Sequence, residues 1–245
     1  MRIATWTIDR RTSAASAQTV VERIAERTPD IVCLAQAHEG SLASLIADAG
    51  GHVIYDRGAD WGGETATSRK LTLWSKAPWR ERAELPGPSS LGGAISAITD
   101  TDLGAVRVVG VCTPSPFASP GGTLPRPPHW SMHIAYLEAL GVCLKALHRS
   151  QPTLIVGAFN QFMPLTWGAW PAHHALTIAL HGFGIVTQGD IPPTGEQAID
   201  HVAVSKHFRA GSVGGLSRVA ADGKPLTDQF GVLVELERGG VQIFD

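Results

Sequence analysis

The sequence has few of the residues that indicate disulfides, membrane spans or a reactive thiol site. Its 245 residues include three cysteines, 7% aromatic residues and 17% charged residues. Cys33, Cys112 and Cys143 lack the paired spacing of a zinc site or a disulfide framework, which favours reduced thiols in the core. No apolar run approaches the ~20 residues that cross a bilayer. A strand is predicted from Arg2 onward, so we expect neither a membrane span nor a signal peptide.

Charge of either sign is also scarce in any one place. The net charge is -2, the pI is about 6.5, and no run of Lys and Arg exceeds two residues. These values give no overall electrostatic reason to expect nucleic acid as a partner. The apolar fraction of 44% is enough to bury a large core. We therefore expect residues 1–245 to form a single domain of a monomeric, cytoplasmic protein.

Hydrophobic patterns predict alternating strands and helices. A strand at 2–9, a helix at 14–27 and a strand at 31–34 indicate a crossover unit with parallel strands. Gly- and Pro-rich turns separate the short strands that follow, which is typical of consecutive antiparallel strands. The remaining predicted strands cover 53–55, 71–75, 94–99, 106–112, 153–156 and 198–205, and the remaining helices cover 130–148 and 172–181.

The segment 153–162 is the most informative stretch of the chain. An apolar strand of four residues ends at Gly157 and is followed by Ala158, Phe159 and Asn160. The loop after a strand is where α/β folds usually hold their chemistry. The segment resembles the Gly-Asp-Phe-Asn motif of the endonuclease/exonuclease/phosphatase superfamily, with Ala158 in place of the acidic residue.

Four further segments resemble motifs of the same superfamily, in the same order. Trp6-Thr7 is similar to its Trp-Asn strand end, and Leu34-Ala35-Gln36 to its Leu-x-Glu strand end. Ile199-Asp200-His201 is similar to its Ile-Asp-His strand, and Thr227-Asp228-Gln229 to its Ser-Asp-His segment. The resemblance spans the whole chain. It implies the DNase I-like fold of the α/β (α+β) class, a four-layer α/β sandwich in which two packed, mainly antiparallel sheets are flanked by helices.

The resemblance also implies which catalytic groups are missing. In the family the Asn holds the phosphate, the Glu is a principal magnesium ligand, and the His exchanges a proton. Thr7 occupies the position of the Asn, Gln36 that of the Glu and Gln229 that of the His. Ala158 replaces the acidic residue of the Gly-Asp-Phe-Asn motif. A neutral amide brings no charge to a hard cation, and glutamine is neither an acid nor a base. We therefore expect no bound metal, no cofactor and no efficient nuclease activity.

The loops near the predicted site are unusually apolar. The segment 162–170 contains five large apolar side chains and no charge. Loops are normally polar, so these side chains must be covered either by the core or by a ligand. Both interpretations remain open. If a ligand binds here, the predicted substrate-binding residues are Thr7, Gln36, Phe117, Trp130, Asn160, Phe162, Trp167 and Gln229.

Two carboxylates remain as candidate catalytic groups. Asp200 and Asp228 are predicted to lie at the base of a largely apolar cavity, where desolvation raises a carboxylate pKa and suits it to general acid/base catalysis. Structural roles stay open for both, as a hydrogen-bond acceptor for Asp200 and a turn carboxylate for Asp228. His201 is expected to face the opposite side of its strand from Asp200. Lys70 is expected to be an exposed residue at a strand end.

Three functions are compatible with this pattern. The first is metal-independent binding of a small, flat, mainly apolar molecule, with proton transfer by the carboxylates. The second is a non-catalytic pseudoenzyme or binding protein, and the third is a weakened magnesium-dependent phosphodiesterase. The sequence favours the first because silencing a site requires no new apolar wall. It does not distinguish natural divergence from deliberate redesign.

Overall fold

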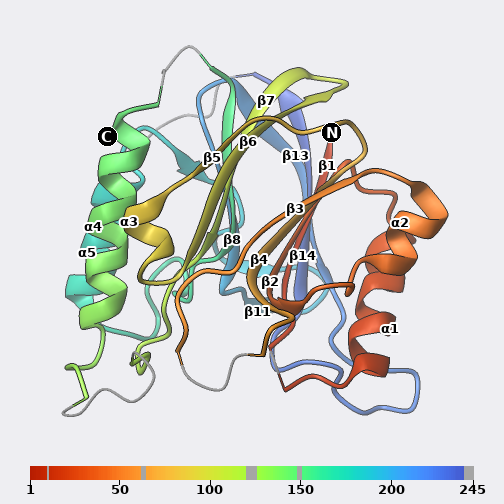
Figure 1. Ribbon diagram of the computed structural model, residues 1–245, viewed down its shortest axis with the longest axis horizontal. Helices are drawn as coiled ribbons and strands as arrows, with labels where there is room; N and C mark the ends of the chain where they lie inside the picture. Colours follow the sequence, from red (N-terminus) through yellow and green to blue (C-terminus); the bar gives the residue numbers. More distant parts are fainter. Residues whose placement is uncertain (10, 62–64, 120–125, 148–150, 240–245) are drawn as a thin grey trace.

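The computed structural model describes residues 1–9, 11–61, 65–119, 126–147 and 151–239 (Figure 1). His148, the last residue of a predicted helix, lies outside the described residues. So do 120–125, which belong to the long loop after the strand that ends at Cys112. All of the predicted catalytic and substrate-binding residues are described.

Two six-stranded sheets form the centre of the molecule. In spatial order the first contains β13 (Phe208–Leu216), β14 (Gly231–Arg238), β1 (Arg2–Thr7), β2 (Ile31–His38), β4 (Ser68–Ser75) and β3 (His52–Asp56). The second contains β5 (Arg80–Glu84), β6 (Gly93–Thr101), β7 (Gly104–Cys112), β8 (Thr153–Ala158), β12 (Asp200–Val204) and β9 (Gly184–Ile185). A separate two-stranded ribbon pairs β10 (Asp190–Ile191) with β11 (Glu196–Gln197).

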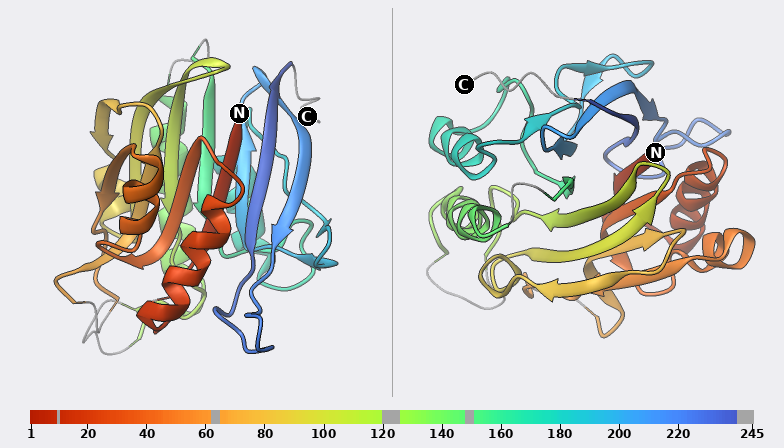
Figure 2. Two further views of the ribbon diagram at one scale, coloured as in Figure 1. Left: turned by 90° about the vertical axis from the view of Figure 1, so that its right-hand side faces the viewer. Right: turned by 90° about the horizontal axis from the view of Figure 1, so that it is seen from above.

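Helices cover the outer face of each sheet, which gives four layers (Figures 1 and 2). The first sheet packs against α1 (Ala14–Ala25) and α2 (Ala43–Ala49), and the second against α4 (Ser131–Lys145) and α5 (Trp170–Ala179). A short helix, α3 (Pro86–Ser89), precedes β6. The largest apolar cluster lies between the sheets and takes residues from both, including Leu71, Val108 and Val234. This arrangement confirms the predicted DNase I-like sandwich.

Each sheet contains one parallel pair within otherwise antiparallel pairing. β1 pairs in parallel with β2 across α1, and β7 pairs in parallel with β8 across α4. Parallel strands need a crossover connection, which the two helices supply. The carboxyl ends of β1 and β2 therefore lie at one edge of their sheet, and those of β7 and β8 at one edge of theirs. In the second sheet, antiparallel β12 begins beside the end of β8, with Asp200 opposite Ala158.

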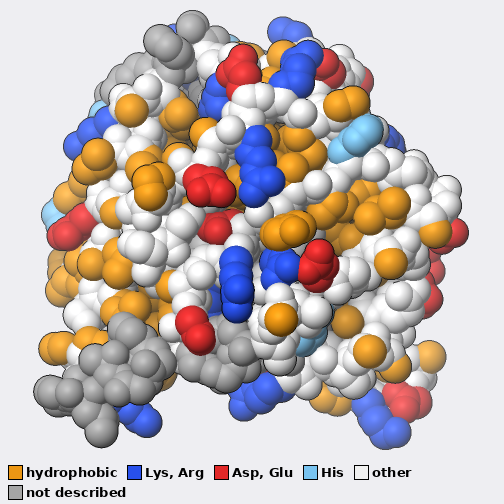
Figure 3. All heavy atoms as spheres, in the orientation of Figure 1, with side chains coloured by type: hydrophobic (Ala, Val, Ile, Leu, Met, Phe, Trp, Pro, Cys, Tyr) orange, Lys and Arg blue, Asp and Glu red, His pale blue; other side chains and the backbone are white. Residues whose placement is uncertain are grey.

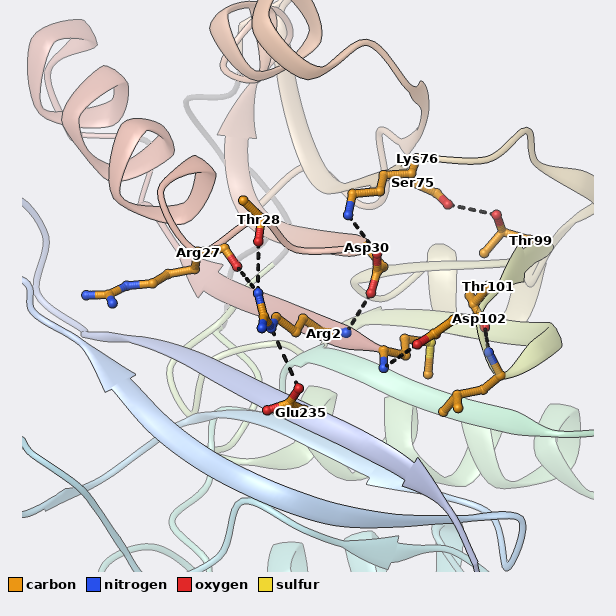
Figure 4. A network of polar contacts seen from close by, with 12 residues as sticks. Arg2, Arg27, Thr28, Asp30, Ser75, Lys76, Thr99, Thr101, Asp102 and Glu235 are labelled. Atoms are coloured by element: carbon orange, nitrogen blue, oxygen red, sulfur yellow. Dashed lines mark hydrogen bonds and ion pairs between the residues drawn. The ribbon is translucent and has the colours of Figure 1, made fainter.

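A polar network holds the opposite end of the molecule, near the N-terminus (Figure 4). The carboxylate of Asp30 accepts hydrogen bonds from the backbone of Arg2 and from Lys76 Nζ, each at 2.8 Å. Ser75 of β4 and Thr99 of β6 form a buried hydroxyl–hydroxyl bond of 2.7 Å that joins the two sheets. The N-terminal amine reaches Asp102 Oδ2 at 3.2 Å. These contacts fix the register of β1, whose other end carries Thr7.

All five residues of the edge strand β5 are exposed, and four of them are charged. Two of its residues form ion pairs with other strands: Arg80 with Asp100 of β6 at 2.8 Å, and Glu81 with Arg107 of β7 at 2.7 Å. On the face shown in Figure 3, Lys and Arg side chains are intermixed with Asp and Glu side chains. Charged side chains on an edge strand discourage pairing with another chain. No described helix is long and apolar enough to cross a membrane.

The structure differs from the sequence prediction in two main respects. First, the sequence does not predict α2, α3, β5, β9, β10, β11, β13 or β14, and β4 begins at Ser68 rather than Leu71. Second, Lys70 is not exposed: its side chain is 4% exposed and its ammonium lies 3.5 Å from the centre of the Trp61 ring. Its stem occupies a slot left by Gly58 and Gly93, where an added Cβ would come within 2.7 Å of it. The slot exists because both residues lack a side chain.

Candidate functional site

Asp200 and Thr7 join the two sheets where β1 ends and β12 begins. The Thr7 hydroxyl donates to Asp200 Oδ1 at 2.7 Å, and the Thr7 backbone N–H donates to Asp200 Oδ2 at 2.8 Å. Asp200 is fully buried and Thr7 is 6% exposed. Of the two predicted roles for Asp200, the hydrogen-bond acceptor is therefore present, with Thr7 as the donor.

Burial has a direct electrostatic effect on Asp200. Desolvation raises its pKa from 3.8 to about 6, and the two hydrogen bonds from Thr7 only partly oppose the shift. No Lys, Arg or His in the described part of the chain forms an ion pair with this carboxylate. A carboxyl group that titrates near neutral pH can both accept and donate a proton under physiological conditions.

Gln36 and Asn160 lie beside this pair in unusual backbone conformations. Gln36 follows Ala35, which is the partner of Thr7 in the parallel pair, and it has a φ of 54° within β2. Asn160 follows β8 with a φ of 52°, and its amide Nδ2 donates to the Thr113 carbonyl at 2.7 Å. Both side chains are half-buried. Thr7, Gln36, Ala158, Asn160 and Asp200 together are termed the strand-end site.

Positive backbone φ values concentrate around the strand-end site. Among the described residues, six that are not glycine have a positive φ. Three of them, Asp9, Gln36 and Asn160, lie in this site or directly after its strands, and a fourth, Trp130, lies in the loop after the neighbouring strand β7. Such conformations cost free energy in non-glycine residues, although Asn and Asp tolerate them best, and they persist where surrounding structure enforces them. The concentration of these backbone conformations near the strand-end site is typical of a functional site.

Asp228 does not lie at the base of an apolar cavity, so that prediction is wrong. Its side chain is exposed, because the segment between β13 and β14 extends outward through a turn closed by the Val219–Pro225 bridge. Asp228 lines a mainly polar hollow of about 390 Å³, together with Asp9, Arg11, Thr12, Ser13, Ser16, Pro225, Leu226 and Thr227. Asp228 is the only predicted site residue among those that line this hollow. The two predicted catalytic carboxylates thus have different surroundings.

Gln229 is held through its backbone rather than its side chain. Its carbonyl accepts a hydrogen bond from Trp6 Nε1 at 2.9 Å and one from Thr227 Oγ1 at 2.6 Å. Trp6 is fully buried and packs against Gly231, where an added Cβ would lie 2.2 Å from the indole ring. The segment that carries Asp228 and Gln229 is therefore anchored to the end of β1.

His201 faces away from Asp200, as predicted, and belongs to a buried network. Its Nε2 donates to the Gln161 carbonyl at 2.9 Å, and its Nδ1 lies 2.9 Å from Thr187 Oγ1. The Gln161 amide donates to His133 Nε2 at 2.8 Å, and His133 Nδ1 donates to the Pro114 carbonyl at 2.7 Å. Burial lowers the pKa of both imidazoles from 6.5 to about 4, so both are neutral near pH 7. The network supports the loops that follow β7 and β8.

Those loops present aromatic side chains to solvent. The described loop residues 113–119, 126–130 and 162–170 are termed the aromatic loops. Phe117 and Trp167 are 64% and 56% exposed. Phe117 makes an edge contact with His129 at 4.6 Å between ring centres, and Trp130 lies 5.9 Å from Trp167. Phe162 is half-buried. The interpretation that the core covers the apolar side chains of 162–170 thus fails for Trp167, whose ring is not covered.

Two buried thiols lie close to the strand-end site without being reactive. Burial and the nearby Asp200 carboxylate raise the pKa of Cys33 well above its usual value, and burial raises that of Cys112 to about 12. A thiol with a raised pKa is a poor nucleophile near pH 7. The Lys70 ammonium counteracts part of the Cys112 shift, which places this buried cation near the same edge.

The residues present do not fit the magnesium centre that the resemblance would imply. No group of three or more His, Cys, Asp or Glu side chains in the described residues is arranged to hold a metal ion. Ala158 is fully buried and has no ligating atom, and both Asp200 oxygens accept hydrogen bonds from Thr7. A hard cation needs several oxygen ligands, preferably charged. The strand-end site offers one carboxylate that is already engaged.

The sequence pattern of the Endonuclease/Exonuclease/phosphatase family matches residues 6–228. The chain belongs to this family. The match begins at the end of β1 and ends at Asp228, so it includes every strand end described above. A search of curated protein sequences finds no match.

Solved structures of family members confirm the fold at low sequence identity. An AP endonuclease from Archaeoglobus fulgidus is 16% identical, with a TM-score of 0.69 over 97% of this chain and 99% of that chain. The 3'-5' exonuclease NExo from Neisseria meningitidis is 18% identical, with a TM-score of 0.66 over 97% and 100% of the two chains. An endonuclease/exonuclease/phosphatase from Beutenbergia cavernae is 16% identical, with a TM-score of 0.65 over 98% and 72%. At these identities the likeness establishes the fold alone.

Proposed function

We propose that this family member binds a small, flat, mainly apolar molecule at the aromatic loops without a metal, and exchanges a proton with it through Thr7 and Asp200. The observation that carries the proposal is the Asp200 carboxylate. It is fully buried, has no ion pair with any described residue, and has a pKa near neutrality. Natural proteins tolerate such a costly group chiefly where function requires it.

The donor set supports metal independence. Gln36 contributes a neutral amide, Ala158 contributes nothing, and each oxygen of Asp200 already accepts one hydrogen bond from Thr7. A magnesium ion placed here would compete with these two short hydrogen bonds and would gain a single carboxylate. The third alternative, a weakened phosphodiesterase, therefore has little support from the geometry.

The aromatic loops support the choice of ligand. Exposed rings of Phe117 and Trp167 offer flat surfaces, and stacking between aromatic groups contributes about 0.5–1.5 kcal/mol beyond simple burial. The described residues 113–119 and 162–170 contain no Lys, Arg, Asp or Glu, and the third segment, 126–130, has Arg126 as its one Lys, Arg, Asp or Glu residue. A charged ligand would find at most this one exposed partner, whereas an apolar ring would bury surface. Asn160 and Gln36 could orient a polar substituent by hydrogen bonds.

The proposed chemical step is a two-proton relay. The ligand gives a proton to Thr7 Oγ1 while the Thr7 hydroxyl proton moves along the existing bond to Asp200 Oδ1, and the reverse step returns it. The relay explains how a carboxylate with no exposed surface could act on a bound molecule. It requires the threonine hydroxyl, so Thr7→Val should abolish transfer while Thr7→Ser should retain it.

Binding of 2-naphthol tests the proposal because its fluorescence reports both stacking and proton transfer. We expect the metal-free protein to bind it, Trp167→Ala to weaken binding at least about 5-fold, and Tyr55→Ala, an exposed aromatic on the other sheet, to leave it unchanged. Deprotonated 2-naphthol emission should fall in Asp200→Asn and Thr7→Val but not in Thr7→Ser. Equal binding by Trp167→Ala and wild type would contradict the proposal.

A second candidate, a non-catalytic binding protein, is favoured by one observation. Asp228, the other predicted catalytic carboxylate, is exposed and lines a hollow that does not include Asp200. The strand-end site therefore holds one of the two carboxylates that the sequence predicts as catalytic. In this case Asp200→Asn and Thr7→Val would change stability alone, and the emission of bound 2-naphthol would match that of wild type.

A further inference from the structure

A second, apolar pocket lies at the other end of β8 and β12 from the strand-end site. It has a volume of about 260 Å³ and is bounded by the last turns of α4 and α5, the start of β8 and the residues after β12. Leu144, Leu147, Ile178 and Phe183 supply most of its apolar lining. Because β8 has six residues, the pocket and the strand-end site are about 17 Å apart along the strand.

The rim of this pocket is positively charged. Lys145 and Lys206 line it and are exposed, and neither forms an ion pair or hydrogen bond with any residue that the structure describes. His181 is a third basic side chain in the lining, which contains no Asp or Glu. The ends of α4 and α5 each carry roughly half a negative charge from unpaired carbonyls. Two full lysine charges outweigh them, so the rim attracts anions.

Size and chemistry together point to one class of ligand. A cavity of about 150 Å³ accommodates benzene, so this pocket has room for a short apolar chain and part of a head group. Ile178 is 52% exposed at its mouth, so apolar surface is available for burial. We propose that the pocket binds a small monocarboxylate, with the apolar chain among the leucine side chains and the carboxylate between Lys145 and Lys206.

Isothermal titration of the full chain with hexanoate, and with hexanamide as a neutral isostere, tests this site. We expect hexanoate to bind with a Kd of about 1 mM or below at low salt and hexanamide to bind at least about 10-fold more weakly. The double variant Lys145→Gln/Lys206→Gln should lose this preference for the acid. Hexanoate has no ring to stack, so Trp167→Ala should bind it like wild type even if the proposed function fails.

The position of the site is tested by a matched pair of exposed helix residues. Ile178→Asp places a carboxylate at the mouth of the pocket and should abolish hexanoate binding. Val142 is 70% exposed on α4 and does not line the pocket, so Val142→Asp should bind like wild type. No heat from hexanoate up to about 10 mM, equal affinity for hexanamide, or equal loss in both aspartate variants would each overturn the proposal. Circular dichroism of each variant confirms that the fold is intact.

Discussion

Replacing the Asp200 carboxylate by an amide should stabilise the protein at neutral and alkaline pH. Its pKa rises from 3.8 to about 6 on folding, so the folded state holds the proton more tightly than the unfolded state. The contribution of this bound proton to the stability of the folded state is complete below pH 3.8 and is lost as the pH rises through 6. Two pKa units correspond to about 3 kcal/mol. Asp200→Asn removes this penalty and keeps both contacts, because the amide oxygen accepts from the Thr7 N–H and the amide nitrogen donates to Thr7 Oγ1.

Guanidinium unfolding at pH 8 and pH 4.5 measures this effect. We expect Asp200→Asn to gain up to about 3 kcal/mol at pH 8, or roughly 6–12 °C in Tm for a chain of this size, and to gain about 1 kcal/mol at pH 4.5. Asp190→Asn, at an exposed position, should change stability by less than about 0.5 kcal/mol at either pH. If Asp200→Asn is destabilised equally at both pH values, the carboxylate is a structural group that costs nothing, and the argument for a functional role fails.

Four other perturbations follow from the same structure. Burial lowers the pKa values of His133 and His201 to about 4, so each neutral imidazole contributes about 3 kcal/mol of stability that is present above pH 6.5 and is lost as the pH falls toward 4. Because their joint loss exceeds the gain from Asp200, urea unfolding should show net destabilisation as the pH falls from 6.5 to 4, and a stability that does not change with pH would contradict this prediction. Gly231→Ala drives a Cβ to 2.2 Å from Trp6 and should cost about 2–3 kcal/mol in the same assay; an unchanged midpoint would show that Trp6 moves freely. Ala158→Asp adds a buried carboxylate opposite Asp200 and should cost about 3 kcal/mol or more without metal, and Mg²⁺ should restore part of the loss; a variant as stable as wild type would refute this. Trp167→Ala should alter Tm little, since the side chain is 56% exposed, while removing the stabilisation by aromatic ligands.

The sequence predicted the fold well where a strand or helix has its own apolar pattern. The first crossover unit was placed almost correctly because Val20, Val21 and Ile24 form the buried stripe of α1 and Ile31 to Leu34 are all buried. β5 was missed because its five residues are exposed and mostly charged, which gives no periodicity. β14 does alternate between buried and exposed residues toward its end. This alternation is visible in the sequence alone.

The site was predicted less completely, because its geometry depends on contacts between segments far apart in the chain. The sequence indicated that Thr7 lies at a strand end and that Asp200 lies within a strand, but the bond between them joins residues separated by 193 positions. The burial of Lys70 depends on Gly58 and Gly93, which lie on other segments. Asp228 was misplaced because its motif suggests a site residue, whereas its exposure follows from the outward path of the segment after β13.

The most direct test of the account is a thermal-shift titration of metal-free protein with Mg²⁺ and Mn²⁺, alongside small aromatic compounds such as indole and 2-naphthol. A ligand that binds the native state raises Tm whether or not its reaction is known. The account predicts that the aromatic compounds raise Tm and that the metals leave it unchanged. If the metals raise Tm and the aromatic compounds do not, the strand-end site is a weakened metal centre and the proposed function is wrong.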